Sequence, residues 1–238
     1  MNEAIPKIIH QVWSGVDGPL PDYFHELGET WKEHHPSWKY MLWDNERMNI
    51  FLQEFYPEYI ERYQSFYFNI QRWDVIRYLI LYQIGGLYAD FDYECLENIE
   101  PVLKGDCCFA MEPEGHRLPF VNDKVPYFNN ALMASRSGHP FMKAVIETVF
   151  SKDLSFLPEN ETRFFRVLCT TGPKMLSDVY LDYSNKDSIY LIPAEEVSPF
   201  STMEIRSIKT NEDIKGEWAS RIKRAYAIHY FIGTWDCD

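Results

Sequence analysis

Two aspartates separated by a single residue, Asp90 and Asp92, end the segment Leu81-Tyr-Gln-Ile-Gly-Gly-Leu-Tyr-Ala-Asp-Phe-Asp92. On a strand, both side chains would point to the same face and repel each other. Just past the end of a strand they can share a hard divalent cation with a diphosphate, because Mg²⁺ and similar ions take oxygen ligands. Most isolated Asp-x-Asp pairs are solvated loop acids, so the elements that lead to this pair decide what it means.

The residues before the acidic pair predict a helix followed by a short strand. Between Asn69 and Ile84, apolar residues recur at helical spacing: Ile70, Trp73, Ile76, Leu79 and Ile80. Gly85-Gly86 ends this helix and also permits a close backbone approach. Leu87-Tyr88-Ala89 is then a short buried strand that delivers the two carboxylates to the edge of a sheet.

Asp74 and Arg77 share one face of the same helix at a spacing of three residues. Two interpretations are open. The pair is either an ordinary salt bridge on the helix surface, or it projects toward Asp90. In the second case Asp74 would bind sugar or ribose hydroxyls, and Arg77 would bind a diphosphate or a hydroxyl.

His229 lies in the apolar segment 224–231, and Gly233-Thr-Trp235 follows within one tight turn. A histidine in such a strand is usually a core residue. An imidazole is also a ligand for Mn²⁺. Beside the acidic pair, we therefore expect His229 to be a third metal ligand and Trp235 to supply an indole donor close to it.

Other polar and aromatic residues have an ordinary structural interpretation and a functional one. Trp13, at the end of the first expected strand, either stacks on a base or packs in the core. Asn129-Asn130 either offers an amide to a sugar or makes a hydrogen bond at a strand end. Glu112-Pro-Glu114 is expected in a loop, with contact to acceptor or sugar as the alternative, and His10 is expected to be structural.

The composition bounds the class of protein and its partners. A chain of 238 residues with 46% hydrophobic and 16% aromatic residues is predicted to form one folded domain, with rings lining a groove. A net charge of −13 argues against nucleic acid or an anionic membrane surface as the main partner. An acidic protein that binds a phosphate ester must supply a cation locally, and a metal on Asp90 and Asp92 would do so.

Targeting signals and cysteine pairs are not evident in this sequence. Its first residues do not form a signal peptide, and no apolar run approaches the about 18 residues that a spanning helix needs. The five cysteines have neither metal-binding nor redox spacing. We expect reduced, buried thiols in a cytoplasmic protein.

Strands and helices are expected to alternate along one compact chain. The expected strands are residues 6–13, 38–43, 87–89, 107–111, 128–134, 189–192 and 224–231. The expected helices are 23–35, 45–68 with a break at Pro57, 69–84, 139–150, and one that begins at 170–173. This order predicts an α/β sandwich with a mostly parallel sheet, in which ligands bind at the carboxyl ends of the strands.

Together these segments resemble the Asp-x-Asp glycosyltransferases of family 32, which include fungal mannosyltransferases and bacterial capsular polysaccharide transferases. The matching segments are Ile5–Trp13, Asp74–Arg77, Gly85–Asp92, Asn129–Ser135, Thr171–Pro173 and His229–Trp235. The resemblance implies a GT-A fold, Rossmann-like, with a mixed sheet flanked by helices in a single domain, 1–238. Residues 1–110 would form the nucleotide-sugar half, and 111–238 the acceptor half with the closing block.

The resemblance also implies an activity and a set of site residues. It implies a retaining hexosyltransferase that uses a UDP- or GDP-sugar with Mn²⁺ or Mg²⁺, acting on a saccharide or lipid-linked saccharide. Bacterial surface or capsular polysaccharide synthesis, peripheral to membrane-bound machinery, is the expected setting. By analogy with glucosylating toxins that share the core, Trp13 would stack on the base and Trp235 would donate to the β-phosphate. The implied residues are Asp74, Arg77 and Asn130 for catalysis, Trp13, Asp74, Arg77, Asp90 and Trp235 for the donor, and Asp90, Asp92 and His229 for the metal.

Other functions are weighed against this one. An Asp-x-Asp phosphatase would need a small residue at position 94, where this chain has Glu94. A glycoside hydrolase would need its two acids on opposite sides of a sugar, not two residues apart. A non-catalytic carbohydrate-binding protein and a toxin-like protein-glucosylating enzyme stay open. Metal-dependent hydrolysis of a nucleotide sugar would exclude the non-catalytic alternative.

Overall fold

The computed structural model describes residues 4–116, 126–151, 161–208 and 216–233. Its centre is a six-stranded sheet in the order β2-β1-β3-β6-β5-β7. The strands are β1 (Ile8–Val12), β2 (Lys39–Trp43), β3 (Gly86–Ala89), β5 (Cys107–Met111), β6 (Phe128–Ser135) and β7 (Tyr190–Ile192). All run parallel except β6, which is antiparallel to both of its neighbours. The predicted α/β fold with a mixed, mostly parallel sheet is confirmed.

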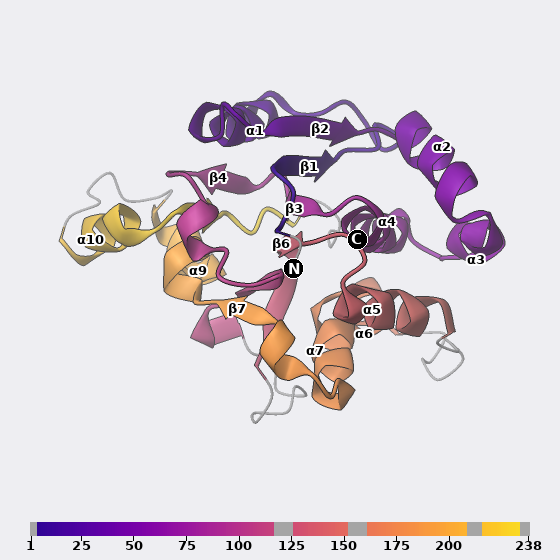
Figure 1. Cartoon of the computed structure of the whole chain (residues 1–238). Coiled ribbons are helices and arrows are strands. Elements are labelled where there is room, and N and C mark those ends of the chain that lie inside the picture. Colours follow the sequence, from indigo (N-terminus) through magenta and orange to yellow (C-terminus); the bar gives the residue numbers. More distant parts are fainter. Residues whose placement is uncertain (1–3, 117–125, 152–160, 209–215, 234–238) are drawn as a thin grey trace.

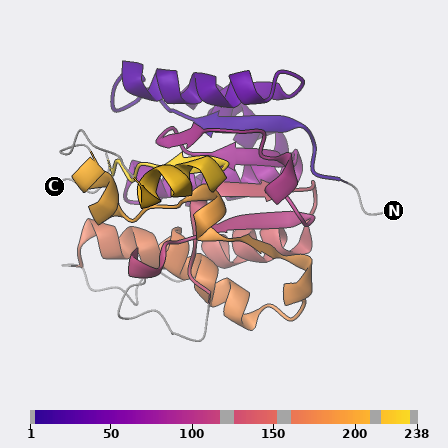
Figure 2. The same ribbon diagram turned by 90° about the vertical axis from the view of Figure 1, so that its left-hand side faces the viewer.

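Helices cover both faces of this sheet. They are α1 (Asp22–His34), α2 (Asn45–Phe55), α3 (Ile60–Gln64), α4 (Asn69–Gln83), α5 (Pro140–Ser151), α6 (Arg163–Thr170), α7 (Pro173–Asp182), α8 (Ala194–Val197), α9 (Thr202–Ile208) and α10 (Glu217–Arg224). Short 3₁₀ turns are η1 (Pro57–Tyr59), η2 (Glu100–Val102), η3 (Glu114–His116) and η5 (Lys186–Ser188). Figure 1 shows α4 to α7 grouped on one side of the sheet, with β4, α9 and α10 on the other. In Figure 2 the strands lie one above another across the middle of the molecule.

Alternation along the buried strands divides the core into two clusters. On β3, Tyr88 packs on the same side as Phe109, while Leu87 and Ala89 pack on the other side with Trp31. Successive strand side chains point to opposite faces, so a run of buried residues serves both clusters. The strand that ends at the acidic pair is therefore held from two sides.

The two glycines between α4 and β3 have backbone conformations that other residues rarely adopt. Gly85 has φ +73° and Gly86 has φ +114°. A Cβ on Gly86 would lie 2.6 Å from the Ile8 carbonyl oxygen on the neighbouring strand. The predicted double role of Gly85-Gly86, helix end and close backbone approach, is confirmed.

His10 has the structural role that was expected for it. Its Nδ1 accepts from Trp43 Nε1 at 3.0 Å, and its Nε2 therefore donates to the Gly85 carbonyl oxygen at 2.9 Å. Burial lowers the pKa of His10 to about 4, so the ring is neutral at pH 7. It ties β1 to the turn that leads into β3.

A second, two-stranded sheet pairs β4 (Tyr93–Cys95) with β8 (Ala227–His229), and Tyr93 lies opposite His229. The expected strand at 224–231 is thus shorter than predicted, because Arg224 still belongs to α10. Other elements not expected from the sequence are β4, α6 and α8 to α10, none of which is longer than eight residues. The partner of β4, β8, is also distant in the chain.

The expectations that no helix spans a membrane and that the cysteines are reduced can be compared with the described residues only. No helix in the described ranges is long and apolar enough to cross a membrane. Cys95, Cys107, Cys108 and Cys169 are buried and free, whereas Cys237 lies outside the described residues.

Candidate active site

A cavity of about 760 Å³ opens at the carboxyl end of β3. Its size is within the range of about 300–1,000 Å³ that small-molecule sites occupy. Its lining includes the predicted site residues that the structure describes: Trp13, Asp74, Arg77, Asp90, Asp92, Asn130 and His229. Trp235, the remaining predicted residue, lies outside the described residues.

The antiparallel course of β6 brings its first residues beside the last residues of β3. The Asp90 amide donates to the Ala131 carbonyl oxygen at 2.8 Å. The pairing of β5 with β6 is irregular between Phe109 and Met111. An irregular ladder of this kind re-aims side chains, and here the consecutive residues Asn129 and Asn130 both line the cavity.

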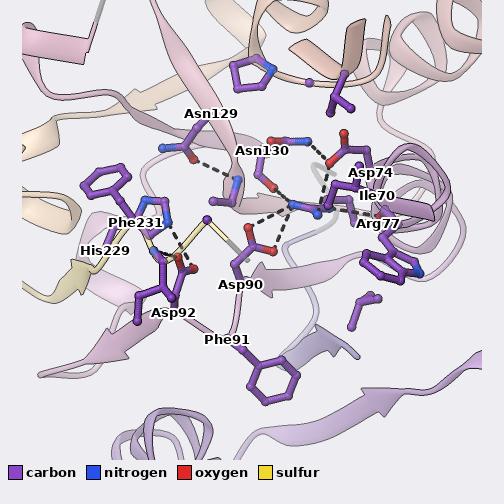
Figure 3. A pocket seen from close by; sticks show the side chains of 18 of the residues that line it. Ile70, Asp74, Arg77, Asp90, Phe91, Asp92, Asn129, Asn130, His229 and Phe231 are labelled. Carbon is purple, nitrogen blue, oxygen red and sulfur yellow. Dashed lines mark hydrogen bonds and ion pairs between the residues drawn. The ribbon is translucent and has the colours of Figure 1, made fainter. Parts of the chain in front are cut away.

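Arg77 is the centre of the polar network and is only 4% exposed. Its Nη2 lies 3.2 Å from Asp74 Oδ1, and its Nη1 lies 3.1 Å from Asp90 Oδ1. Nη1 also donates to the Asn130 carbonyl oxygen at 2.9 Å, and Nε donates to the Trp73 carbonyl oxygen at 3.2 Å. Burial alone would lower the pKa of Arg77, but Asp90 and Asp74 raise it above its ordinary value. Of the two interpretations of Asp74 and Arg77, the structure supports the one in which they project toward Asp90 (Figure 3).

Asp74 is held from three directions at the wall of the cavity. Oδ1 accepts from Asn130 Nδ2 at 2.8 Å, and Oδ2 accepts from Thr171 Oγ1 at 2.7 Å. Burial raises the pKa of Asp74 to about 6, although Arg77 and these hydrogen bonds oppose the rise. The side chain is therefore a fixed, buried carboxyl group, with a position set by α4, by β6 and by Thr171, which follows the last residue of α6.

Asp90 leaves the strand end and turns toward Arg77. Its backbone oxygen accepts from Gln11 Nε2 at 3.3 Å, and its Oδ1 accepts from the Tyr88 hydroxyl. Burial, with Asp92 close by, raises the pKa of Asp90, and Arg77 acts against this rise. The side chain is 29% exposed, so part of the carboxylate faces the cavity.

Asp92 turns away from Asp90 and pairs with His229 (Figure 3). Asp92 Oδ1 lies 3.2 Å from His229 Nε2, and Oδ2 accepts from the Ile232 amide at 2.8 Å. Burial would raise the pKa of Asp92, but His229 and the Ile232 amide lower it below its ordinary value. Burial would lower the pKa of His229, and Asp92 raises it overall.

The metal prediction concerns Asp90, Asp92 and His229 as one set. Within the described ranges, His, Cys, Asp and Glu side chains do not form a group of three or more that could hold a metal ion. The three side chains do not converge on one point in this structure, because Asp90 pairs with Arg77 while Asp92 pairs with His229. The distance between Asp92 Oδ1 and His229 Nε2 still fits two adjacent ligands of one ion, which lie roughly 3 Å apart when each bond is about 2.1 Å. The metal role of all three residues stays a prediction.

Trp13 lies at one end of the cavity, next to the aromatic rings of Phe24 and Phe91. Its Nε1 donates to the Gly18 carbonyl oxygen at 3.0 Å. The ring is half-buried, so it packs on the core and also contributes to the cavity wall. Both interpretations of Trp13 are compatible with this position, and its role as a base platform stays a prediction.

The acidic pair and its approach match a known family. Residues 21–109 match the model of the family described as a glycosyltransferase sugar-binding region containing the DXD motif. This match includes α4, the two glycines and Asp90-Phe-Asp92.

The chain belongs to the Asp-x-Asp glycosyltransferase family. Inositol phosphoceramide mannosyltransferase 3 of Schizosaccharomyces pombe is 32% identical over 180 residues, which are 74% of this chain and 45% of that protein. An uncharacterized glycosyltransferase of Acanthamoeba polyphaga mimivirus is 28% identical and aligns over 92% of this chain and 86% of its own. The chain spans less than half the length of the first fungal relatives that it matches, 45% and 43%.

The solved structure of the PaToxG glycosyltransferase supports the fold of this family member. It superposes with a TM-score of 0.51 at 17% identity, over 75% of this chain and 68% of that one. At this identity the likeness concerns the fold alone. The fold is of the GT-A type, as the sequence analysis expected.

Several residues that build the site of this family member were not identified from the sequence. Thr171 holds Asp74, and Tyr78 donates to the Thr171 carbonyl oxygen at 2.6 Å while its hydroxyl oxygen accepts from Asn130 Nδ2 at 2.9 Å. Gln11 supports Asp90 from β1. Two of them lie in segments that resemble the family, Gln11 in Ile5–Trp13 and Thr171 in Thr171–Pro173, but neither segment indicated which residue would contact Asp74 or Asp90.

Proposed function

We propose that this protein transfers a hexose from a nucleoside-diphosphate sugar to a hydroxyl of a saccharide or lipid-linked saccharide, with retention of anomeric configuration. The observation that carries the proposal is the network in which Arg77 joins Asp74 to Asp90 at the carboxyl end of β3. In open α/β sheets, this edge is where ligands bind. Membership of the glycosyltransferase family supports the same reaction class.

The roles within the site follow from which groups are already committed. The Arg77 guanidinium contacts Asp74, Asp90, Asn130 and Trp73. We therefore assign Arg77 the role of orienting the two carboxylates, rather than that of a free arm that reaches the diphosphate. Asp74 would accept from hydroxyls of the donor sugar, and Trp13 would lie against the base.

Asp92 and His229, with Asp90, would hold a divalent cation together with diphosphate oxygens of the donor. When bound, such a cation would neutralise the charge that develops on the leaving diphosphate. His229 Nε2 and Asp92 are already adjacent. The acceptor hydroxyl would approach the same face of the sugar that the diphosphate leaves, which accounts for retention without a protein nucleophile.

The identity of the sugar, the acceptor and the cellular setting are further proposals that depend on the proposed transferase activity. Because three of the fungal relatives are named inositol phosphoceramide mannosyltransferases, mannose is the first donor sugar to test. Capsular or surface polysaccharide synthesis in the cytoplasm of a bacterium, beside membrane-bound machinery, rests on the resemblance alone.

A panel of UDP- and GDP-sugars with Mn²⁺ tests the proposal, read by thermal shift and by slow release of free sugar. We expect one donor to raise the melting temperature and to be hydrolysed, and Asp92→Asn to abolish that hydrolysis. A donor that binds but is never cleaved, with or without acceptor, would favour the non-catalytic alternative. Transfer to protein rather than to saccharides would favour the toxin-like one.

A further inference from the structure

Beyond the acidic pair, the cavity continues to polar side chains that the proposed donor site does not use. Figure 3 shows Asn129 with His229 and Phe231 on one side of Asp90, and Asp74 on the other. Asn129 is the second residue of β6, and Glu112 follows β5 directly, so both lie at the same edge of the sheet. The Glu112 amide donates to the Tyr127 carbonyl oxygen at 3.0 Å, which fixes this arrangement.

Asn129 has one half of its amide group committed and the other half free. Oδ1 accepts from the Ala131 amide at 3.0 Å and from the Leu132 amide at 3.3 Å. The residue is 2% exposed, and Nδ2 is buried without a hydrogen-bond partner among the described residues. Burial raises the pKa of the Tyr93 hydroxyl, and Asn129, which faces this hydroxyl, acts against the rise as a side-chain hydrogen bond would. That hydroxyl is hydrogen-bonded to Ser198 at 2.6 Å, and Asn129 Nδ2 makes no hydrogen bond of ordinary geometry with it. A buried donor without a protein partner, on the wall of a cavity, is a position from which a hydrogen bond can be donated to a bound ligand or a water.

Glu112 is similarly half committed. Its Oε2 accepts from His116 Nδ1 at 2.8 Å. In the described part of the chain, no hydrogen bond is made to Oε1. The side chain is 10% exposed and lines the cavity, so its free oxygen is an acceptor for a ligand hydroxyl.

His116 and Thr202 support Glu112 rather than acting as an acid–base relay. Thr202 Oγ1 lies 3.1 Å from His116 Nε2, a separation that would suit a proton transfer. The same nitrogen already accepts from the Thr202 amide at 2.8 Å, so its lone pair is not available to a substrate. With Nδ1 bound to the carboxylate, the ring fixes the Glu112 side chain in place.

Phe231 provides an apolar ring beside His116 and His229. Its ring centroid is 3.9 Å from that of His229 and 4.5 Å from that of His116. Its φ of +49° places it in the left-handed region, which non-glycine residues seldom occupy outside functional sites. A donor, an acceptor and an aromatic ring together are the groups that a ring bearing several hydroxyls requires.

We propose that Asn129 and Glu112, with the Phe231 ring packed against His116 and His229, form the subsite for the saccharide acceptor. Asn129 Nδ2 donates to one hydroxyl oxygen, and Glu112 Oε1 accepts from another hydroxyl. This subsite rests on the proposed function and extends it, because it assigns the acceptor to a place in the cavity.

Two isosteric variants test the subsite by steady-state kinetics. Asn129→Asp keeps the oxygen that accepts from Ala131 and Leu132 but removes the free donor, and Glu112→Gln removes the charge with little change in shape. The matched control is Asn98→Asp, because Asn98 Oδ1 also accepts from a backbone amide, that of Glu100 at 2.9 Å, and Asn98 is exposed away from the cavity. Acceptors are the methyl glycosides of glucose, galactose and mannose, with the donor found in the UDP- and GDP-sugar panel.

We expect each test variant to raise the KM for the acceptor by about tenfold, which corresponds to a loss of about 1.4 kcal/mol in binding free energy. The KM for the donor should change by less than about threefold in the same variants. An acceptor KM equal to that of Asn98→Asp in both variants would overturn the subsite. A rise in donor KM instead would assign these residues to the donor sugar and overturn the acceptor assignment. If Asn129→Asp loses its cooperative melting transition, Glu112→Gln decides between these outcomes.

Binding without turnover separates this inference from the proposed function. Saturation-transfer difference NMR with the methyl glycosides, in the presence of UDP or GDP and Mn²⁺, should show contact in the parent and lose it in Glu112→Gln. Glycoside binding that depends on Glu112 without cleavage of any donor would overturn the proposed function and keep the subsite. Glycoside binding that is equal in the parent and Glu112→Gln would overturn the subsite whatever the turnover.

Discussion

Arg77 joins three segments of the chain through a single guanidinium. It contacts Asp74 on its own helix, Asp90 after β3 and the Asn130 carbonyl oxygen on β6. Both Arg77 and Asp74 have side chains that are 5% exposed, which excludes an ordinary surface salt bridge of about 0–1 kcal/mol. Because the fork of a guanidinium presents donors in fixed directions, lysine cannot reproduce these contacts.

Arg77→Lys should therefore reduce donor turnover by roughly tenfold or more. Its charge is retained, so the loss of stability should be smaller than the about 3–5 kcal/mol expected for Arg77→Ala, which leaves the buried Asp74 and the partly buried Asp90 without their cation. Hydrolysis rates and denaturant unfolding measure the two effects. Arg136→Lys is the control, since Arg136 pairs with Asp106 at 3.8 Å in a more exposed setting. Wild-type kinetics in both Arg77 variants would remove this residue from the site.

Asp92 is more enclosed than a strand-end acid facing solvent would be. Its side chain is 12% exposed and contacts both His229 and the Ile232 amide. Asp92→Asn keeps an oxygen for the Ile232 amide, so we expect a stability loss of only about 1 kcal/mol. It removes the charge that raises the pKa of His229, so burial should then lower the pKa of His229 below its value in the parent.

NMR titration of the His229 ring checks the pKa shift, and donor hydrolysis should fall almost to zero in the same variant. An unchanged His229 titration would mean that the pairing with Asp92 does not control this ring. Turnover within a few-fold of the parent would show that Asp92 does not hold the cation.

Among the elements, β3 is the strand that places the acidic pair, and its entry depends on Gly86. The strand is short, and it lies between β1 and β6. The position of Asp90 therefore follows from how closely the first residue of β3 approaches β1. A side chain at that residue would collide with the Ile8 carbonyl oxygen.

Gly86→Ala should destabilise the fold by about 3 kcal/mol or more, because strain at positive φ adds to a backbone collision. Gly138→Ala is the matched control. Gly138 has φ +66°, but a Cβ there would meet no atom within 4 Å, so about 1 kcal/mol of strain is expected. Denaturant midpoints measure both. Equal losses in the two variants would show that the close approach to β1 is unimportant.

The elements that could be predicted from sequence are those whose pattern is local. The α4 periodicity, the two glycines and the buried runs of β1, β3, β5 and β6 follow from spacing and composition, and the structure has them close to the expected bounds. The antiparallel course of β6 and the pairing of β4 with β8 were not predictable in this way. They are set by contacts between segments far apart in the chain, such as Tyr93 with His229.

The candidate site also has a part that could be predicted from local sequence and a part that could not. Asp74, Arg77, Asp90 and Asp92 were identified because they lie close together in sequence, on one helix and after one strand. Their contacts could not be predicted from the same spacing: Asp90 pairs with Arg77, whereas Asp92 pairs with His229. Thr171 reaches Asp74 from another part of the chain, and no short-range spacing signals this contact. For Glu112, contact with acceptor or sugar was one of two sequence interpretations, but its position at the same sheet edge as Asn129 depends on the pairing of β5 with β6.

For the whole molecule, charge sets the strongest constraint on the reaction. The chain carries a net charge of −13, and Asp17, Asp74, Asp90, Asp92 and Glu112 all line the cavity. The buried cation there, Arg77, is already shared between two carboxylates. Arg163 and Arg206 also line the cavity. A nucleoside diphosphate would add further negative charge to this space, so its binding requires compensation that the protein's own side chains supply only in part.

We therefore expect donor binding and turnover to depend on a divalent cation, with Mn²⁺ at least as effective as Mg²⁺, because an imidazole beside a carboxylate suits Mn²⁺ better. Removal of divalent ions should lower turnover by at least about a hundredfold, since the cation contributes several kcal/mol to stabilising the leaving group. The measurement is hydrolysis of the preferred nucleotide sugar in excess chelator, followed by addition of each ion, with KCl at matched ionic strength as the control. The chelator should also weaken binding of the free nucleoside diphosphate in calorimetry, because the same charge is left uncompensated without any chemistry. Full activity in excess chelator would mean that Arg77, Arg163 and Arg206 balance the diphosphate by themselves, and the assignment of Asp92 and His229 to a cation would then be wrong.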